Sequence, residues 1–229
     1  MSGMEYLRKG IKDGLVMNTA YNVMTVKKIR LYLFYLVREG LFAGENFHPE
    51  PKLSPCETFY LEPSDLKNIA AKAERDYPEE KMLDMLSAGH KCLGIKHHDE
   101  IVAYGWINLQ NCNSHLMSFP LKENEAYLYG ARTFTAYRGK NLAPYLRYQI
   151  YTHLADMGRT RLFSITEFGN IASIKFKKKL GARNLKLGMK ITLLNKHSWN
   201  FILRNYPDAY AARSAVPREI SHGNGVPCI

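Results

Sequence analysis

The sequence has no long apolar segment. Its longest uninterrupted apolar run is Leu31–Val37, seven residues, far below the roughly 18–20 that a membrane-spanning helix needs. The beginning of the chain also does not have the apolar core and small-residue cleavage site of a secretory signal peptide. We therefore expect neither an integral membrane protein nor an exported one.

Cysteine is scarce as well. The chain has four cysteines, which are Cys56, Cys92, Cys112 and Cys228. They form no C-x-x-C pair, and none has a histidine at the spacing of zinc ligands, so no metal site is expected. Without an export signal the thiols are expected to be reduced, which places the protein in the cytoplasm, with the inner face of the membrane left open.

Negative charge is in deficit. The chain has 32 Lys and Arg against 21 Asp and Glu, a net charge of +11. Such an excess favours an anionic partner, which could be nucleic acid, a phospholipid surface or a phosphorylated ligand. The basic residues are spread along the chain and accompany no known nucleic-acid motif, which argues against nucleic acid.

Composition changes along the chain indicate three segments. Residues 1–50 are a basic, apolar extension and linker, residues 51–195 carry a regular pattern of elements, and residues 196–229 are an extension and tail. We expect a helix over Thr25–Glu39. It either packs on the domain or on a second copy in a homodimer, or it makes residues 1–40 a peripheral contact with an anionic membrane.

The central segment is predicted to contain alternating strands and helices. Strands are expected over residues 57–62, 91–96, 101–109, 126–135, 161–165 and 186–194, and helices from 63, from 78, over 142–157 and over 170–179. Gly130 interrupts one strand, which suggests a bulge. Hairpins followed by strand–helix alternation predict an α/β (α+β) fold whose mixed sheet has helices on its faces.

The segment that indicates chemistry is Tyr137–Ala143, which lies between the bulged strand and the strongest helix. A helix N-terminus presents unpaired N–H groups and partial positive charge, so it binds phosphate well. Gly139 permits a tight turn, Arg138 and Lys140 add cationic donors, and Ala143 leaves room for close approach. The residues thus predict a pyrophosphate cradle, although a basic surface turn would give the same pattern.

These residues resemble a known signature. Arg138-Gly139-Lys140-Asn141-Leu142-Ala143 is similar to the Arg/Gln-x-x-Gly-x-Gly/Ala motif of the GNAT superfamily of N-acetyltransferases. Asn170-Ile171-Ala172-Ser173 and Leu180-Gly181-Ala182 resemble its second conserved region. The resemblance covers residues 56–195 and includes the order of the elements.

The resemblance implies a GNAT fold with a mostly antiparallel sheet and a splayed strand pair, and acetyl-CoA as cosubstrate without a metal. Residues 138–143 and Asn170 would bind acetyl-CoA, and the backbone near Thr133 and Phe134 would pair with its pantetheine arm. Asn141 stands where the family has a central glycine, and asparagine tolerates the left-handed conformation. Lys177 stands where many relatives carry the tyrosine that protonates the departing thiolate.

The implied reaction is direct transfer of the acetyl group to a primary amine, on a small molecule or at a surface. A carboxylate near the splayed strands would remove the proton of the amine. Glu125, at the start of the bulged strand, is the first candidate, and Glu167, at the end of the next strand, is the second. Two other readings stay open, a degenerate domain that only binds acyl-CoA and a basic module that binds a membrane surface or nucleic acid.

Overall fold

The structure, a computed structural model, describes residues 29–40 and 48–208. Its main feature is a sheet with the strand order β10-β9-β1-β8-β7-β4-β3-β2. The strands are β1 (Ile29–Glu39), β2 (Glu57–Tyr60), β3 (Lys91–His97), β4 (Glu100–Asn108), β7 (Glu125–Thr133), β8 (Arg161–Glu167), β9 (Arg183–Leu193) and β10 (His197–Asn205). A small hairpin, β5 (Asn111–Asn113) with β6 (Ser118–Pro120), stands beside this sheet.

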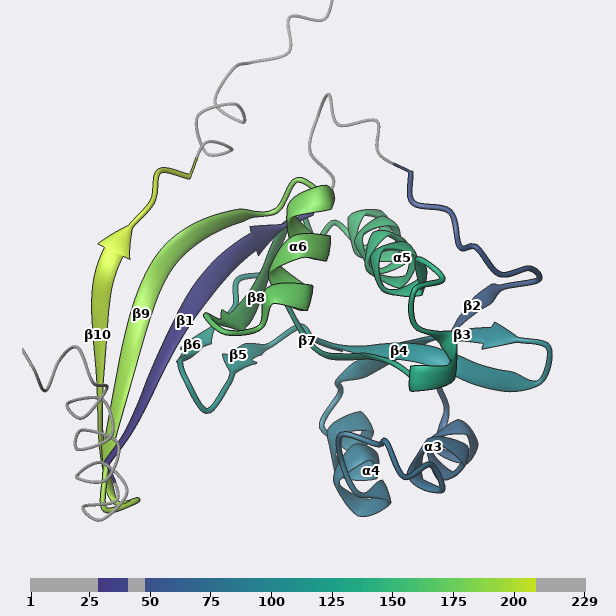
Figure 1. The fold of residues 1–229 in the computed structure, drawn as a ribbon, viewed down its shortest axis with the longest axis horizontal. Helices are drawn as coiled ribbons and strands as arrows, with labels where there is room; N and C mark the ends of the chain where they lie inside the picture. The colour runs from purple at the N-terminus through teal and green to yellow at the C-terminus, as the bar shows by residue number, and fades with distance from the viewer. Residues whose placement is uncertain (1–28, 41–47, 209–229) are drawn as a thin grey trace, which may run out of the picture.

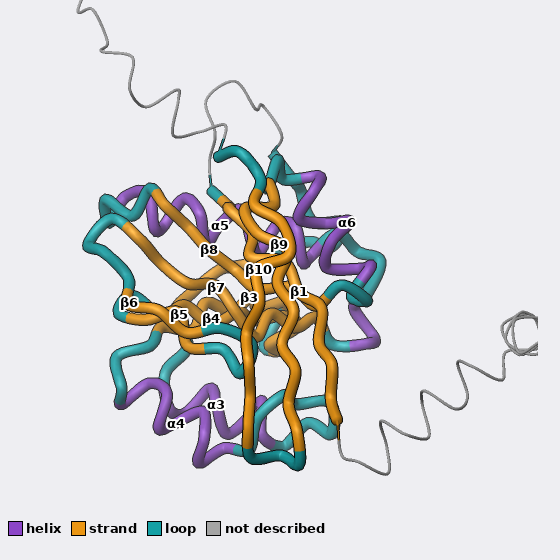
Figure 2. Tube along the Cα trace, turned by 90° about the vertical axis from the view of Figure 1, so that its left-hand side faces the viewer, coloured by secondary structure: helices purple, strands orange, loops and turns teal. Residues whose placement is uncertain are grey.

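Helices cover both faces of the sheet (Figures 1 and 2). On one side lie α5 (Leu142–Asp156) and α6 (Ile171–Lys179), and on the other lie α3 (Pro63–Ala70) and α4 (Glu79–Ser87). One core joins α5 to the sheet through residues such as Ile107, Leu128 and Ile150. A second core joins α3 and α4 to the opposite face around Met82 and Trp106. The predicted fold class is confirmed, and so are the helices and strands expected between residues 57 and 194.

The expected helix over Thr25–Glu39 is wrong. Residues 29–39 form strand β1, and residues 25–28 lie outside the described part of the chain. β1 pairs antiparallel with β8, from Phe34 opposite Glu167 to Glu39 opposite Leu162, and with β9 along its whole length. The sheet therefore continues across both expected segment boundaries, since β10 extends it beyond residue 195. Ile29–Glu39 is an internal strand of the sheet, so it cannot be the interfacial helix that was considered.

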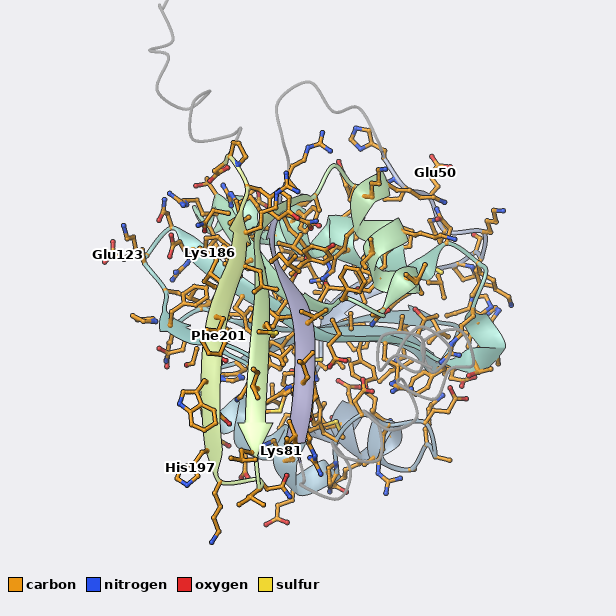
Figure 3. The ribbon with its side chains drawn as sticks, turned by 60° about the vertical axis from the view of Figure 1, so that its left-hand side comes forward. Glu50, Lys81, Glu123, Lys186, His197 and Phe201 are labelled. Carbon is orange, nitrogen blue, oxygen red and sulfur yellow. The ribbon has the colours of Figure 1, made fainter. Side chains whose placement is uncertain are left out.

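β10 is an exposed edge of this sheet. It pairs with β9 on one side only, and every residue of the strand is exposed. Its exposed apolar side chains are Trp199, Phe201, Ile202 and Leu203. Figure 3 shows Phe201 and His197 projecting from this strand.

The one parallel pair of the main sheet is β7 with β8, and it is short. The pairing runs from Glu125 opposite Arg161 to Tyr127 opposite Phe163 and ends there, after which the strands diverge. Just beyond that point β7 has a bulge against β4, at Gly130, whose φ is 54°. An added Cβ at Gly130 would lie 3.0 Å from the Trp106 ring, so glycine satisfies both the backbone angle and the space. The bulge that the sequence predicted is present, and it lies where the strands splay.

Candidate functional site

The loop before α5 has the geometry of an anion cradle. Gly139 has φ 77°, and an added Cβ there would meet no atom within 4 Å. Asn141 has φ 61°, so it adopts the left-handed conformation that the sequence required of it. The first-turn N–H groups of Leu142 and Ala143 cannot be paired within the helix, and Pro144 has no N–H. The loop therefore presents backbone donors, and the side of Gly139 is open.

Asn141 also holds a neighbouring segment in place. Its side-chain Nδ2 donates to the carbonyl oxygen of Glu50 at 2.6 Å, and the Lys52 N–H donates to the carbonyl oxygen of Lys140 at 2.9 Å. Residues 50–52, at the boundary expected between the first and second segments, are thus bound to the loop. The asparagine that replaces glycine in the motif has acquired a structural role.

A groove of about 850 Å³ opens at this loop. Its walls come from the loop, from the first turn of α5 and from α6. The cationic residues that line it are Lys52, Arg138, Lys175 and Lys179. The groove thus brings together the predicted residues Thr133, Arg138, Gly139, Asn141, Leu142 and Ala143. A phosphate-bearing ligand would meet backbone donors and positive charge together.

A second cavity, of about 730 Å³, lies between the splayed ends of β7 and β8 and joins the groove. Thr133, Arg138, Ala143, Ala172 and Phe176 line both. Two buried polar atoms of its walls, Thr133 Oγ1 and Arg147 Nη1, have no hydrogen-bond partner in the described chain. A buried polar group without a partner is unfavourable, so these atoms mark where a polar ligand would be stabilised.

Two residues that were predicted to bind acetyl-CoA, Phe134 and Asn170, make other contacts within the protein. The Phe134 N–H donates to the Val102 carbonyl, and the Phe134 carbonyl accepts from the Tyr137 N–H. The Phe134 side chain is buried in the core with α3 and α4. The Phe134 N–H is therefore already paired within the protein, while its carbonyl oxygen keeps a second lone pair. Asn170 caps α6, with Oδ1 accepting from the Ser173 N–H at 3.0 Å, and it also lines the second cavity.

Lys177 lies in a buried ionic cluster at the wall of the second cavity. Its Nζ donates to Ser164 Oγ at 2.7 Å and to Thr166 Oγ1 at 2.6 Å, and it lies 3.3 Å from Glu39 Oε1. Glu39 is fully buried, and its Oε2 lies 3.5 Å from Arg147 Nε. The three protons of the Lys177 ammonium are thus directed at partners within the protein.

The charges of this cluster depend on one another. Burial would raise the pKa of Glu39, but Arg147, Lys177 and the hydrogen bonds from Ser164 and Tyr151 outweigh it and lower the pKa to about 2. Burial lowers the pKa of Lys177 to about 8, although Glu39 opposes the shift. No local pattern points to Glu39, because the residues that its side chain contacts lie more than 100 positions away along the chain.

A third cavity, of about 460 Å³, lies on the face of α4. Tyr77, Tyr129, Gly130 and Ile165 line both this cavity and the second one, so the three cavities adjoin one another across the sheet. His90 also lines this cavity. Its Nδ1 lies 2.5 Å from the Tyr129 hydroxyl, and its Nε2 lies 2.9 Å from Asn108 Nδ2. Only the fold reveals this cluster, because His90 and Tyr129 are 39 residues apart.

The two candidate bases lie outside the walls of these cavities. Glu125 is buried, with Oε2 accepting from the Lys122 N–H at 3.0 Å and Oε1 3.5 Å from Arg161 Nε. Glu167 is exposed, and its Oε1 lies 3.8 Å from Nε2 of His115, which lines the third cavity. The structure thus brings Glu167 near the rim of that cavity and holds Glu125 at the start of the parallel pair.

Three further observations concern the described residues. Cys56, Cys92 and Cys112 are free thiols. No group of three or more His, Cys, Asp or Glu side chains in this part of the chain could hold a metal ion. No helix within residues 29–40 and 48–208 is long and apolar enough to cross a membrane.

Comparisons with known proteins agree with this geometry. Similar solved structures include a GNAT-family acetyltransferase of Colwellia psychrerythraea (15% identity, 77% of this chain and 57% of that chain, TM-score 0.51) and a Drosophila protein (16%, 80% and 59%, TM-score 0.52). Another is a protein of Novosphingobium aromaticivorans described as an acetyltransferase of the GNAT family (16%, 70% and 63%, TM-score 0.50). The chain thus spans less than two thirds of the length of these structures, and at such identities the likeness shows the fold.

No curated protein matches the sequence. The profile of the acetyltransferase (GNAT) family matches residues 56–182, more than half of the chain, including the cradle loop, both splayed strands and α6. The chain therefore belongs to the GNAT acetyltransferase family.

Proposed function

We propose that the protein transfers an acetyl group from acetyl-CoA directly to a primary amine. The observation that carries this proposal is the row of three adjoining cavities at the splayed strands. The first is cationic and has free backbone donors, while the third is a polar cavity on the opposite face of the sheet. We propose that two substrates enter from opposite faces and meet where β7 leaves β8.

The residues of the first two cavities fit acetyl-CoA. The loop at Arg138 and Gly139 and the first turn of α5 would hold the pyrophosphate, and Lys175 and Lys179 would face the remaining phosphate. The unpaired Thr133 Oγ1 and Arg147 Nη1 are donors for the polar arm or the thioester carbonyl. A fixed donor at the carbonyl oxygen would stabilise the negative charge that develops there during attack.

In the reaction the amine nitrogen forms a bond to the carbonyl carbon, and the bond from carbon to sulfur breaks. The amine releases a proton, and the departing thiolate takes one up. No described residue that lines the third cavity, hereafter the α4-side cavity, is a carboxylate. Asp76 lines the second cavity, but its carboxylate is paired with Arg132, so we propose that the proton leaves to solvent at the open mouth. Catalysis would then come mainly from holding the amine against the thioester, an effect that can be worth about 7–11 kcal/mol.

A second candidate function is acyl-CoA binding without turnover. It is favoured by Lys177, whose protons are all directed at internal partners, and by the position of Glu125 outside the cavities. Release of free thiol from acetyl-CoA in the presence of an amine separates the two functions, because a binding domain would be stabilised by acetyl-CoA and release nothing.

Binding of acetyl-CoA is tested by thermal unfolding. A ligand that binds only the folded state stabilises it, by about 2.7 kcal/mol at 100 times its Kd. We expect acetyl-CoA to raise the Tm of the protein and to have little effect on the double variant Arg138→Glu, Gly139→Glu. Arg75→Glu, on the loop after α3 and outside the groove, is the control for a charge reversal elsewhere on the surface and should respond like the parent. Equal stabilisation of parent and double variant would remove acetyl-CoA from this loop.

A further inference from the structure

The α4-side cavity is built from hydrogen-bond donors and neutral polar groups. Its lining residues are Tyr77, Lys81, Met85, His90, Asn108, Asn113, Ser114, His115, Tyr127, Tyr129, Gly130 and Ile165. Lys81, on the first turn of α4, is the permanent cation among them, and these described residues include no aspartate or glutamate (Figure 3 labels Lys81). A cavity of this composition does not suit a polycation.

A chain of hydrogen bonds fixes the polarity of this cavity, and it begins at the backbone. Asn108 Oδ1 accepts from the N–H groups of Gln110 at 2.8 Å and Asn111 at 3.1 Å. Only the oxygen of an amide can accept, so the Asn108 side chain has one orientation. Its Nδ2 therefore donates to His90 Nε2, which lies 2.9 Å away.

The next step fixes the tautomer of His90. Because Nε2 accepts from Asn108, the proton of the neutral imidazole lies on Nδ1, which faces the Tyr129 hydroxyl at 2.5 Å. Burial lowers the pKa of His90, which agrees with the neutral form. The Tyr129 oxygen thus accepts from His90, and its own O–H is left to donate elsewhere.

The Tyr129 O–H has no other hydrogen-bond partner in the described part of the chain. Burial, with smaller contributions from neighbouring groups, raises the pKa of Tyr129, so the phenol keeps its proton. The ring is held by Tyr127, stacked at 5.3 Å, and by Trp106. Tyr129 is therefore a rigid donor that borders both the second cavity and the α4-side cavity.

We propose that the acceptor molecule carries, besides its amine, an anionic oxygen group such as a carboxylate or a phosphate, which Tyr129 and Lys81 bind in the α4-side cavity. This inference rests on the proposed function, because it takes the α4-side cavity as the acceptor site. The Tyr129 hydroxyl still has its proton to donate, and an ammonium only donates, so an acceptor oxygen on the ligand satisfies both. Polyamines and lysine-rich peptides would instead need carboxylates around their remaining positive charges.

The test compares amines that differ only in the anion. The full chain is incubated with acetyl-CoA and either member of a pair, glucosamine 6-phosphate against glucosamine or an amino acid against its amide, and free thiol is measured. Spermidine is the polycationic comparison. We expect at least a tenfold higher kcat/KM for the anionic member of one pair, and the responding pair tells phosphate from carboxylate. Faster reaction with spermidine or with the neutral members overturns the proposal.

Two variants assign the effect to the residues. Tyr129→Phe keeps the stacked ring and removes the donor, and Lys81→Met removes the charge. Each is expected to reduce the preference for the anionic member about tenfold, since a hydrogen bond to a charged group is lost. Lys67→Met, an exposed lysine of α3 outside the cavity, is the control. An unchanged preference in both variants would place the anion elsewhere.

Thermal unfolding separates a failure of the proposed function from a failure of the anion assignment. If acetyl-CoA does not stabilise the parent protein, the proposed function fails first. If acetyl-CoA stabilises it and neutral amines release thiol, but no anionic amine does so or adds further stabilisation, the anion assignment alone is overturned.

Discussion

At the scale of single residues, Glu39 joins two buried cations at the wall of the second cavity. It is completely buried and is the carboxylate partner of both Arg147 and Lys177. Removing one partner from such a cluster leaves buried charge without compensation, which typically costs about 3–5 kcal/mol. The cluster also lies beneath the splayed strands, so Glu39 positions the two cations that border the second cavity.

Glu39 should make stability depend on pH in acid. Its folded-state pKa, about 2, lies below the ordinary value of 4.5, so its contribution is present above about pH 4.5 and is lost as pH falls toward 2. The shift corresponds to about 3 kcal/mol. We expect Glu39→Gln to be less stable than the parent by about this amount at pH 7, with the difference shrinking below pH 4.5. Urea unfolding at several pH values measures it.

The exposed Glu57 provides the control. Glu57→Gln on β2 should change the free energy of unfolding by less than about 0.5 kcal/mol at every pH. A destabilisation by Glu39→Gln that stays constant from pH 7 to pH 2 would mean that the variant acts through packing and not through its charge.

The two candidate bases now differ in a measurable way. The Glu125 carboxylate is held by the Lys122 N–H and Arg161, so Glu125→Gln is expected to lower the free energy of unfolding while turnover stays within about fivefold of the parent. A full general base would contribute about 10²–10⁴-fold. Glu167→Gln, at the rim near His115, tests the other candidate in the same thiol-release assay. A hundredfold loss of turnover in either variant, with the fold intact, would identify that residue as the base.

Residue roles could be predicted where the signal was local. Gly139, Asn141 and Arg138 lie within four positions, and the backbone requirement of the cradle selects their types. The roles of Glu39 and His90 could not be predicted, because their partners lie on distant strands and helices. A lone glutamate or histidine in the sequence has no periodicity or spacing to interpret.

At the scale of elements, β1 shows why the sequence of an internal strand can be mistaken for that of a helix. Its apolar run has no strict alternation, because residues on both faces toward its C-terminal end are buried, from Leu36 to Glu39. A short apolar run of this kind cannot be assigned from periodicity alone. The tyrosines, valine and isoleucine of the segment favour a strand, but the basic residues around it suggested an amphipathic helix.

β1 makes the N-terminal segment indispensable for the fold. A chain that begins at residue 41 lacks an internal strand and leaves Arg147 and Lys177 without Glu39. We expect it to lose cooperative thermal unfolding, whereas a chain that begins at residue 29 keeps β1 and unfolds cooperatively. Circular dichroism during heating compares the two. If the chain from residue 41 unfolds with the Tm of the chain from residue 29, β1 is dispensable and the sheet closes without it.

At the scale of the whole molecule, the hairpins and the strand–helix alternation could be predicted, because their patterns span about 30 residues. The strand order β10-β9-β1-β8 could not be predicted. The first described strand lies between two strands formed from residues beyond 160. No local pattern specifies such a pairing, because it depends on which long-range contacts bury the most surface. For the same reason the row of adjoining cavities became visible only in the folded structure.

The net charge of +11 also acts on the whole molecule, and it should steer an anionic ligand toward the groove. Acetyl-CoA carries several negative charges, and the groove has four cationic residues, Lys52, Arg138, Lys175 and Lys179. We expect its association rate, measured by stopped flow, to fall about tenfold between roughly 20 mM and 200 mM salt, because salt screens charges that are farther apart than about 10 Å. The dissociation rate should change much less.

Two matched variants separate the effect of a lysine's position on the association rate from the effect of the net charge. Lys175→Glu and Lys196→Glu change the net charge equally, but Lys175 lines the groove whereas Lys196 lies in the turn between β9 and β10. We expect Lys175→Glu to slow association several-fold more and to weaken its salt dependence. If both variants slow it equally, the overall charge steers the ligand and the groove adds nothing. If association of the parent protein does not depend on salt, the cationic lining does not guide acetyl-CoA, and the backbone donors of the cradle loop would have to account for its binding.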